Sequence, residues 1–296
     1  MRTLVGLARW GAVAAIVVTH AFAGVADAQD AGDAWPRRVL ITNDNGIEDP
    51  KIHALALAMS RIAETYVAAP AEDESGTGSS MSLFRDGSLA VKEVEVAGAA
   101  GAWAVDGYPA DCVVWALLGP LRDTPPDLVL SGVNGGANIG REWFGSGTVG
   151  AARTAAFLGL PAVAISGLDD SDTDQVEKTM KWVVELAQSG VVRSLDDGRY
   201  LTVSIPPAGH IRGVKVVPRD KGVMEIDLDE ADPGEDGWTT WRITGLRPGA
   251  PDAGGDIEAF LDGWIVVIPM RAHESDVNAI QRLQQAPEAI PAWPAP

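Results

Sequence analysis

Short apolar strands alternate with helical stretches along the first part of the chain, and this order constrains the fold more than any other feature. Residues 39–42 (VLIT) and 65–69 (TYVAA) have the length and composition of buried strands, and a helical pattern over residues 50–62 lies between them. Nearly continuous apolar strands joined by helices are typical of a parallel sheet covered on both faces. We therefore predict an α/β fold with helices on both faces of a parallel-rich sheet.

The alternation of strands and helices continues to about residue 187, and short strands separated by charged turns follow. The further elements expected in the first part are an antiparallel excursion over 86–105, helices over 110–118, 148–158 and 173–187, and strands over 128–130 and 162–165. From residue 201 onward we expect strands over 201–205, 214–217, 238–243 and 264–268, an acidic hairpin over 224–236 and a helix over 274–284. The chain has no internal repeats, so we expect one domain over residues 29–286 and a proline-rich tail over 287–296.

The N-terminus has the features of a secretory signal. Arg2 and Arg9 supply positive charge, residues 11–18 (GAVAAIVV) form an apolar run, and residues 26–28 (ADA) fit a small-residue cleavage site. An N-terminal membrane anchor is the alternative, but the apolar run is shorter than the roughly 20 residues that span a bilayer. We therefore expect residues 1–28 to be removed and the mature protein to be exported, either to the periplasm or out of the cell.

The charge and the cysteine content disfavour several classes of function. The chain carries 41 Asp and Glu against 23 Lys and Arg, a formal net charge of −18. This balance disfavours binding to nucleic acid polymers and to anionic membranes, because both attract basic surfaces. Cys112 is the single cysteine, so the chain can form neither an internal disulfide nor a cysteine-based metal cluster. The histidines of the expected mature chain, His53, His210 and His273, do not cluster in sequence, which disfavours a zinc site.

Three polar loops each follow an apolar strand, at residues 43–46, 72–82 and 131–147. Loops at the carboxyl ends of parallel strands share one edge of the sheet and form its ligand crevice. The groups that these loops offer are oxygens: the carboxylate of Asp44, the hydroxyl of Ser75, and the carbonyls of Asn43, Asn45 and Asn134. Hard divalent cations such as Mg²⁺ and Mn²⁺ take ligands of this kind. The loops therefore predict a divalent-metal site.

Residues 146–152 (SGTVGAA) offer a place for an anion beside that metal. Small residues at a helix start leave backbone N–H groups open to an anion, and the helix dipole favours negative charge there. A phosphate held next to a divalent cation would be placed for hydrolysis. Each motif alone also has a structural interpretation: a plain turn at residues 43–46, a solvated Ser75 hydroxyl, or close packing at the helix start.

Six segments match, in order, the motifs of a known protein family. They are residues 39–46 (VLITNDNG), 69–76 (APAEDESG), 107–112 (GYPADC), 126–140 (PDLVLSGVNGGANIG), 146–166 (SGTVGAARTAAFLGLPAVAIS) and 256–270 (DIEAFLDGWIVVIPM). The first three resemble the strand with its Asn-Asp-Asp-Gly turn, the Ala-Pro…Ser-Gly loop and the Gly-Thr-Pro-Ala-Asp-Cys segment of the SurE family of metal-dependent 5′/3′-nucleotidases and acid phosphatases. The resemblance covers almost all of the expected mature chain.

The resemblance implies a Rossmann-like α/β domain with a protruding antiparallel β-hairpin region, commonly a homodimer or homotetramer. It also implies one divalent metal ion per subunit, Mg²⁺ or Mn²⁺, held at positions that are Asp44, Asn45, Ser75 and Asn134 here. Asp44 and Asn45 would be the catalytic residues. The phosphate would face Asn43, Asn138, Ser146, Gly147 and Thr148. The activity that the resemblance implies is hydrolysis of nucleoside monophosphates or of other small phosphate esters.

Three positions depart from the family's pattern. Asn45 stands where the family has a second aspartate, so it offers an oxygen without charge, and we expect weaker metal binding. Glu74 stands where the family often has arginine, and its carboxylate would either repel a phosphate or supply the charge that Asn45 lacks. Lys51 replaces the glycine of the family's Pro-Gly-Ile segment.

Three other functions are alternatives. A non-catalytic SurE-like protein with a decayed metal site would bind a ligand or partner outside the cell, and Asn45 and Glu74 motivate this hypothesis. Dinucleotide binding is suggested by Gly-x-Gly-x-x-Gly at residues 145–150 with Asp169 about 20 residues on, but that fingerprint requires a strand immediately before it, where this chain has a glycine-rich loop. A serine esterase is disfavoured, because no Gly-x-Ser-x-Gly occurs in the chain.

Overall fold

The computed structural model describes residues 34–82, 87–196, 198–207, 209, 211–221, 225–233, 238–247 and 250–285. The chain divides into two compact units, Met1–Ala34 and Trp35–Pro296, and every element below belongs to the second. The expected signal segment over residues 1–28, His210 and the expected tail over residues 287–296 lie outside the described residues. Those expectations, and the expected domain bounds, stay predictions.

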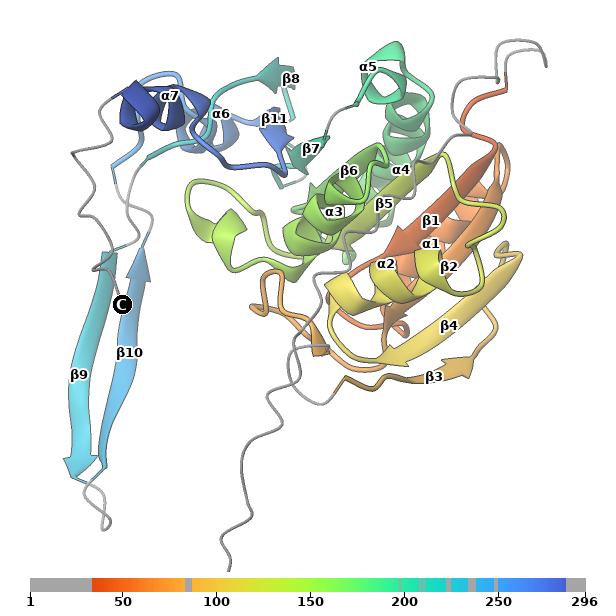
Figure 1. The fold of residues 1–296 in the computed structure, drawn as a ribbon. Coiled ribbons are helices and arrows are strands. Elements are labelled where there is room, and N and C mark those ends of the chain that lie inside the picture. The colour runs from red at the N-terminus through yellow and green to blue at the C-terminus, as the bar shows by residue number, and fades with distance from the viewer. Residues whose placement is uncertain are drawn as a thin grey trace, which may run out of the picture. The chain divides into compact units, whose positions relative to one another are not determined.

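A nine-stranded sheet organises the second unit, with the strand order β3-β4-β2-β1-β5-β6-β7-β11-β8 (Figure 1). The strands are β1 (Arg38–Thr42), β2 (Glu64–Pro70), β3 (Ala90–Glu93), β4 (Gly101–Asp106), β5 (Leu128–Asn134), β6 (Ala162–Ser166), β7 (Arg199–Ser204), β8 (Gly213–Val216) and β11 (Trp264–Arg271). From β4 through β7 all neighbours are parallel, which confirms the predicted parallel-rich sheet. The predicted antiparallel excursion is confirmed for β3 against β4, but β4 itself lies parallel to β2.

Helices cover both faces of the sheet, as predicted. One face packs against α1 (Pro50–Met59) and α4 (Thr173–Ala187), and the other against α2 (Pro109–Leu118) and α3 (Gly147–Phe157). The two buried clusters therefore lie on opposite sides of β1, with Val39 and Ile41 in the first and Leu40 in the second. This alternation is what a strand buried on both faces requires. It holds the carboxyl end of β1 rigidly at the centre of the sheet.

Helix α1 ends before its predicted end, and helix α7 (Val277–Gln285) begins three residues after its predicted start at residue 274. α1 starts at Pro50 with Asp49 as its N-cap, whose carboxylate accepts from Lys51 N–H at 2.7 Å, and it ends at Met59 rather than at residue 62. The backbone N–H groups of residues 62 and 63 both donate to the Met59 carbonyl, so the chain turns early towards β2. Sequence reasoning missed α5 (Gly190–Arg193) and α6 (Asp256–Leu261), both shorter than two helical turns.

The acidic segment after residue 224 forms one strand rather than a whole hairpin. β9 (Glu225–Pro233) pairs antiparallel with β10 (Thr239–Arg247) in a separate two-stranded sheet. Apolar Ile226 and Leu228 alternate with acidic residues along β9, which is the period of a strand, and the partner strand begins only at Thr239. The predicted β-hairpin region is confirmed with this corrected register.

The β5 strand runs four residues beyond its predicted end at residue 130, and it reaches Asn134. Gly132 makes this extension possible, because a Cβ at that position would lie 2.3 Å from the Ile165 carbonyl oxygen of neighbouring β6. Its φ of +133° also lies in a region that favours glycine. The first part of the predicted 131–147 loop is therefore strand, which fixes the place of Asn134.

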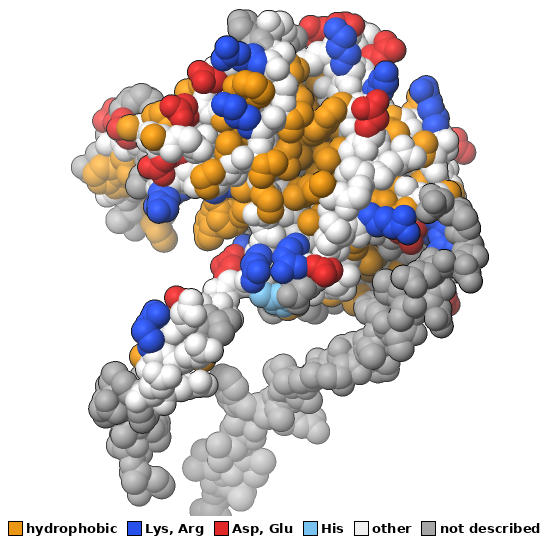
Figure 2. Space-filling view, turned by 90° about the horizontal axis from the view of Figure 1, so that it is seen from above, with side chains coloured by type: hydrophobic (Ala, Val, Ile, Leu, Met, Phe, Trp, Pro, Cys, Tyr) orange, Lys and Arg blue, Asp and Glu red, His pale blue; other side chains and the backbone are white. Residues whose placement is uncertain are grey.

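The surface combines charged and apolar side chains. Figure 2 shows hydrophobic side chains gathered over the middle of one face, with Lys, Arg, Asp and Glu interspersed around them. A cavity of about 650 Å³ is lined by Trp182 of α4, Ile205 just after β7 and Ile265 of β11, together with polar residues such as Asp172 and Lys178, and none of the predicted site residues lines it. In the described part of the chain, no helix combines the length and the apolar character needed to cross a bilayer.

Candidate functional site

The loops after β1, β2 and β5 meet at one edge of the sheet. β1 lies between β2 and β5, and both pairings are parallel, so the three carboxyl ends point the same way. Backbone hydrogen bonds join the loops directly: Glu74 N–H donates to the Asp44 carbonyl at 2.8 Å, and Gly78 N–H donates to the Gly145 carbonyl at 2.8 Å. Segments that lie 30 and 67 residues apart in the chain thus build one site, as the parallel topology predicts.

Asp44 is fixed by the start of helix α3. Its carboxylate accepts the Thr148 backbone N–H at 3.0 Å on Oδ2 and the Thr148 hydroxyl at 2.5 Å on Oδ1. Asp44 is only 2% exposed and Thr148 is fully buried. The negative carboxylate therefore sits at the positive end of the α3 dipole, where the two hydrogen bonds also hold its orientation.

Burial raises the pKa of Asp44 above its ordinary value, and the nearby negative charge of Asp73 raises it further. The hydrogen bonds from Thr148 oppose this shift but do not cancel it. A buried carboxylate without a full counter-charge is energetically costly, and a bound cation would relieve that cost. Binding of a cation beside the ionised Asp44 carboxylate is therefore electrostatically favourable.

Buried oxygens without partners lie beside Asp44. Asn43 is fully buried, and its Nδ2 donates to the Gly46 carbonyl at 2.8 Å, which leaves its Oδ1 as the free acceptor. Among the residues that the structure describes, neither Asn43 Oδ1 nor Asn45 Oδ1 has a hydrogen-bond partner. Buried polar atoms are nearly always satisfied in folded proteins, so two unpartnered oxygens within one turn of the chain indicate that a ligand binds there.

Ser75 and Asn134 lie on the loops that flank the Asp44 turn. Ser75 is exposed, and its N–H donates to Asp73 Oδ1 at 2.8 Å. Asn134 is half-buried at the end of β5, where its Nδ2 donates to the Gly136 carbonyl at 2.8 Å. This hydrogen bond uses the amide nitrogen and leaves Asn134 Oδ1 available as an acceptor. The structure places both residues at the predicted edge, and their contact with a metal stays a prediction.

Of the predicted phosphate-facing residues, Ser146, Gly147 and Thr148 form the buried start of α3. Ser146 is the N-cap, and its hydroxyl accepts the Val149 N–H at 3.1 Å. The N–H groups of Thr148 and Val149 are thus already used, whereas the Gly147 N–H has no partner among the described residues. Asn138 is 8% exposed, and its Nδ2 donates to Ser166 Oγ at 2.7 Å. An anion at this helix start would be met by Gly147 first.

The residues at the site fit a hard divalent cation rather than zinc. The available donors are one carboxylate, three amide oxygens and a hydroxyl, which is the donor chemistry that Mg²⁺ and Mn²⁺ prefer. No group of three or more His, Cys, Asp or Glu residues within the described ranges could hold a metal. His53 Nε2 lies 2.8 Å from the Ile47 carbonyl, and the His273 ring packs against Phe157. The buried Cys112 thiol has a pKa well above its ordinary value because of burial, so it stays protonated.

The dinucleotide alternative is not supported by the fold. α3 follows a short 3₁₀ helix, η2 (Glu142–Phe144), and the preceding strand β5 ends at Asn134. The Gly-x-Gly-x-x-Gly fingerprint requires a strand that leads straight into the glycine turn. Gly150 instead serves a close approach, because a Cβ there would lie 2.0 Å from the Gly78 carbonyl oxygen. Its role is to let the loop after β2 pack onto α3.

Sequence reasoning missed the groups that support the site from behind. It assigned Thr148 to the phosphate but not to the anchoring of Asp44, and it gave no role to Arg219, which donates to the Asn138 carbonyl at 2.6 Å. The only sequence signal for Arg219 is its place after a short strand, before the acidic hairpin. Such support depends on tertiary contacts, which local patterns do not reveal.

Comparisons with known proteins agree with this arrangement. The family model described as "Survival protein SurE" matches residues 39–225. The chain is similar to "5'-nucleotidase SurE 1" of Burkholderia lata, with 35% identity over 257 residues, 83% of this chain and 95% of that protein. It is also similar to "5'-nucleotidase SurE 1" of Thermus thermophilus, with 35% identity, 79% of this chain and 91% of that protein. The crystal structure of the SurE protein from Aquifex aeolicus superposes with a TM-score of 0.70 at 27% identity, covering 84% of this chain and 99% of that one.

Proposed function

The chain belongs to the SurE family, and from this premise we propose that it is a 5′-nucleotidase, a divalent-metal-dependent phosphomonoesterase that hydrolyses nucleoside monophosphates or other small phosphate esters. The observation that carries the proposal is the buried Asp44 carboxylate, held by Thr148 at the start of α3 beside orphaned amide oxygens. A cation at the carboxylate and a phosphate at the helix start would then be neighbours.

The residues that would hold the metal are Asp44, Asn45, Ser75 and Asn134. When bound, the ion supplies positive charge that polarises the phosphoryl group. Asp44 is the one carboxylate among these four, so it is the group that can orient an attacking water. Thr148 keeps that carboxylate in place through its N–H and its hydroxyl.

The phosphate would lie against Gly147 and the side chain of Asn138. The Gly147 N–H, which has no partner among the described residues, would donate to the negative charge that develops on the phosphoryl group during hydrolysis, as preorganised backbone donors do in other transfer sites. Asn43 and Ser146 would lie beneath the phosphate. Asn43 has an Oδ1 without a partner among the described residues, and Ser146 caps α3. We propose one Mg²⁺ or Mn²⁺ ion per subunit, on the donor chemistry alone.

The direct test is release of inorganic phosphate from nucleoside 5′-monophosphates by the purified protein. The protein is stripped with chelator and assayed without metal and then with Mn²⁺ or Mg²⁺. We expect no turnover without metal and turnover that saturates with added ion. Absence of metal-dependent turnover on every phosphate ester in a broad panel would sink the proposal.

Asn45→Asp should tighten metal binding, because it adds a second carboxylate to a site with one. We expect the Mn²⁺ dissociation constant of the stripped protein to fall by about tenfold or more, since the affinity of hard-cation sites follows ligand charge. Titration calorimetry measures this without any turnover. The matched control is Asn278→Asp, on helix α7 (Val277–Gln285), which adds the same charge away from the site. Equal Mn²⁺ affinity in the wild type and in Asn45→Asp would place residue 45 outside the metal shell.

The alternative of a non-catalytic protein with a decayed metal site is disfavoured. The similar proteins are named 5'-nucleotidases over nearly their whole length, and Asn45 still offers a buried oxygen without a partner among the described residues. The double variant Asn45→Asp with Glu74→Arg separates the two cases. Phosphate release that appears only in the double variant would support decay, and release by the wild type supports catalysis.

We further propose that the protein is exported, to the periplasm or out of the cell, and that it is a homodimer or homotetramer. The first proposal is supported by the N-terminal pattern of Arg2, the apolar run and the ADA site. The second is supported by large apolar side chains exposed in the two-stranded sheet, among them Trp238, just before β10, at 80%, and Trp241 and Ile243 on β10 at 57% and 65%. N-terminal sequencing of protein recovered outside the cytoplasm, and light scattering after size exclusion, test the two proposals.

A further inference from the structure

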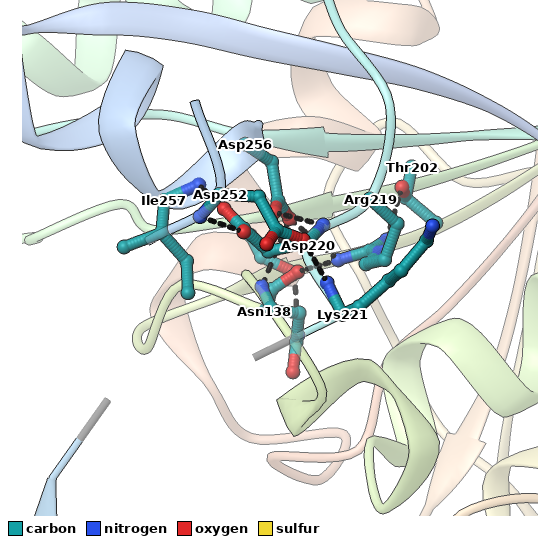
Figure 3. A network of polar contacts seen from close by, with 10 residues as sticks. Asn138, Thr202, Arg219, Asp220, Lys221, Asp252, Asp256 and Ile257 are labelled. Atoms are coloured by element: carbon teal, nitrogen blue, oxygen red, sulfur yellow. Dashed lines mark hydrogen bonds and ion pairs between the residues drawn. The ribbon is translucent and has the colours of Figure 1, made fainter. Parts of the chain in front are cut away.

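A buried polar network lies behind the Asn138 loop, and Arg219 is at its centre (Figure 3). The Arg219 guanidinium donates from Nη1 to the Asn138 carbonyl at 2.6 Å and to Asp256 Oδ2 at 3.2 Å, and from Nη2 to Thr202 Oγ1 at 2.7 Å. The side chain of Arg219 is 12% exposed and that of Asp256 is 0% exposed. One planar side chain thus bridges strand β7, helix α6 and the loop that follows β5.

Asp256 holds the same loop at a second point. Its Oδ2 accepts the Gly140 N–H at 2.9 Å, while its Oδ1 accepts the Asp220 N–H at 2.8 Å. The two partners of the ion pair therefore bind the two ends of a three-residue segment. Arg219 bonds to the carbonyl of residue 138, and Asp256 bonds to the N–H of residue 140. Gly140 has a φ of +53°, and a Cβ there would lie 2.8 Å from Ile257 Cδ1, so the segment packs tightly onto α6.

The segments that supply this pair are themselves braced. The Asp220 carboxylate accepts the Ile257 N–H at 3.0 Å and also the Asp252 N–H, and Lys221 N–H donates to Asp252 Oδ2 at 2.8 Å. Arg141 Nε donates to the Lys221 carbonyl at 3.0 Å, which ties the loop to this frame once more. The Asn138 loop is thus attached at several points to one network of hydrogen-bonded segments.

The geometry requires arginine and not simply a positive charge. A guanidinium presents several N–H groups in one fixed plane, whereas the ammonium of lysine is a single point charge on a flexible stem. Burial lowers the pKa of Arg219, and the charge of Asp256 opposes that change. A buried ion pair seldom stabilises a fold more than apolar packing of the same volume would. The main effect of this ion pair is therefore to fix the position of residues 138–140.

We propose that Arg219, paired with Asp256, is a positioning residue that holds the Asn138–Gly140 segment so that Asn138 faces the substrate phosphate. The proposal rests on the proposed phosphomonoesterase function. Asn138 is bound on its side-chain nitrogen by Ser166 and on its carbonyl by Arg219. Loss of the second contact frees the main chain while the first remains, which shifts the side chain relative to Gly147 and the metal ligands. Displacements of about 1 Å at such positions are sufficient to lower rates about a hundredfold.

The test compares Arg219→Lys and Arg219→Met with the stability control Val203→Ala. Lysine keeps a charge opposite Asp256 but cannot reach the three acceptors together, whereas methionine leaves Asp256 buried without its partner. Val203 neighbours Thr202 on β7 but faces the opposite layer of the sheet, so its truncation lowers stability without touching the loop. For each protein the melting temperature, kcat, KM and the inhibition constant of inorganic phosphate are measured with Mn²⁺. Hydrogen exchange of the residue 138–141 amides is measured without substrate.

We expect Arg219→Lys to keep a melting temperature near that of the wild type, while kcat/KM falls and the inhibition constant of phosphate rises, each by about tenfold or more. Arg219→Met should show the same kinetic loss together with a lower melting temperature. Val203→Ala should lose stability and keep its kinetic constants within about twofold. Both Arg219 variants should exchange the 138–141 amides faster.

Wild-type kinetic constants and wild-type exchange in Arg219→Lys would overturn the proposal, because charge alone would then suffice. A kinetic loss in Val203→Ala as large as that in Arg219→Met would also overturn it, because loss of stability would then explain both. If the wild-type protein itself released no phosphate, the proposed function would fail, and the exchange measurement would still report whether Arg219 holds the loop.

Discussion

Asp44→Asn is expected to abolish phosphate release while the protein stays folded. The substitution removes the one carboxylate among the proposed metal ligands, so turnover with Mn²⁺ should fall by about a thousandfold or more. The asparagine can still accept the Thr148 N–H, and the Thr148 hydroxyl can turn to accept from the new amide, so the start of α3 keeps its contacts. Steady-state phosphate release and Mn²⁺ calorimetry should lose signal together.

The metal-free protein should be as stable or more stable after the Asp44→Asn substitution, although its activity is lost. Because the pKa of Asp44 is raised in the folded protein, the favourable contribution is present while the carboxyl is protonated and is lost as the pH rises through the folded pKa. At neutral pH the ionised carboxylate of the metal-free protein therefore opposes folding. Asparagine removes that charge, so the metal-free variant should melt at or above the wild-type temperature, and the difference should shrink as the pH is lowered.

Asp127→Asn is the matched control. Asp127 accepts the Arg37 and Arg38 N–H groups at 2.7 and 2.9 Å at the opposite end of β1, so the same change in charge lies away from the site. It should leave phosphate release unchanged. If Asp44→Asn kept more than about a tenth of wild-type turnover, or melted well below the wild type, Asp44 would be a structural residue and the site would have to be placed elsewhere.

Gly150→Ala is expected to damage stability and activity together. A Cβ at residue 150 would lie 2.0 Å from the Gly78 carbonyl oxygen and 2.6 Å from its carbonyl carbon, so the backbone of the loop after β2 must move away. Overpacking of this kind costs roughly 1–3 kcal/mol and occasionally more. The displaced loop carries Ser75, so turnover should fall by about a hundredfold. Denaturant unfolding and phosphate release at saturating Mn²⁺ measure the two effects.

The helix propensities of alanine and glycine make the Gly150→Ala result easy to interpret. Alanine in a helix interior is normally better than glycine by about 0.5–1 kcal/mol, so any loss of stability must come from the contact with Gly78. Gly190 in α5 has nothing within 4 Å of a built Cβ, and Gly190→Ala should leave stability and turnover at wild-type levels or slightly above. A stabilised and active Gly150→Ala would show that the loop after β2 does not depend on close approach to α3.

The sequence predicts which residues meet at the sheet edge, because the loops that follow neighbouring parallel strands must lie at the same edge. The apolar runs of β1, β2 and β5 could be recognised from composition, and the polar residues after them had to meet once the strands were parallel. The start of α3 was predictable for a similar reason, since Ser146 and the glycines after it form a recognisable cap. The sequence alone therefore indicates that Asp44 and Gly147 lie near each other.

The support behind the site could not be predicted in this way. α6 is too short for a periodic pattern, and the role of Asp256 depends on Arg219, which is 37 positions away in the chain. The hairpin register was missed because the acidic residues of β9 read as a turn, although they alternate as one strand. Contacts of this kind depend on packing between distant segments, which no local pattern specifies.

The most direct measurement of the central claim is the anomalous scattering of Mn²⁺ in crystals of the wild-type protein. The account predicts one strong peak per subunit, bound by oxygens of Asp44, Asn45, Ser75 and Asn134, at roughly the 2.0–2.6 Å that hard divalent cations require. It also predicts that the peak disappears in Asp44→Asn crystals grown in the same way. A peak at another position, or no ordered Mn²⁺ at this edge of the sheet, would contradict the account.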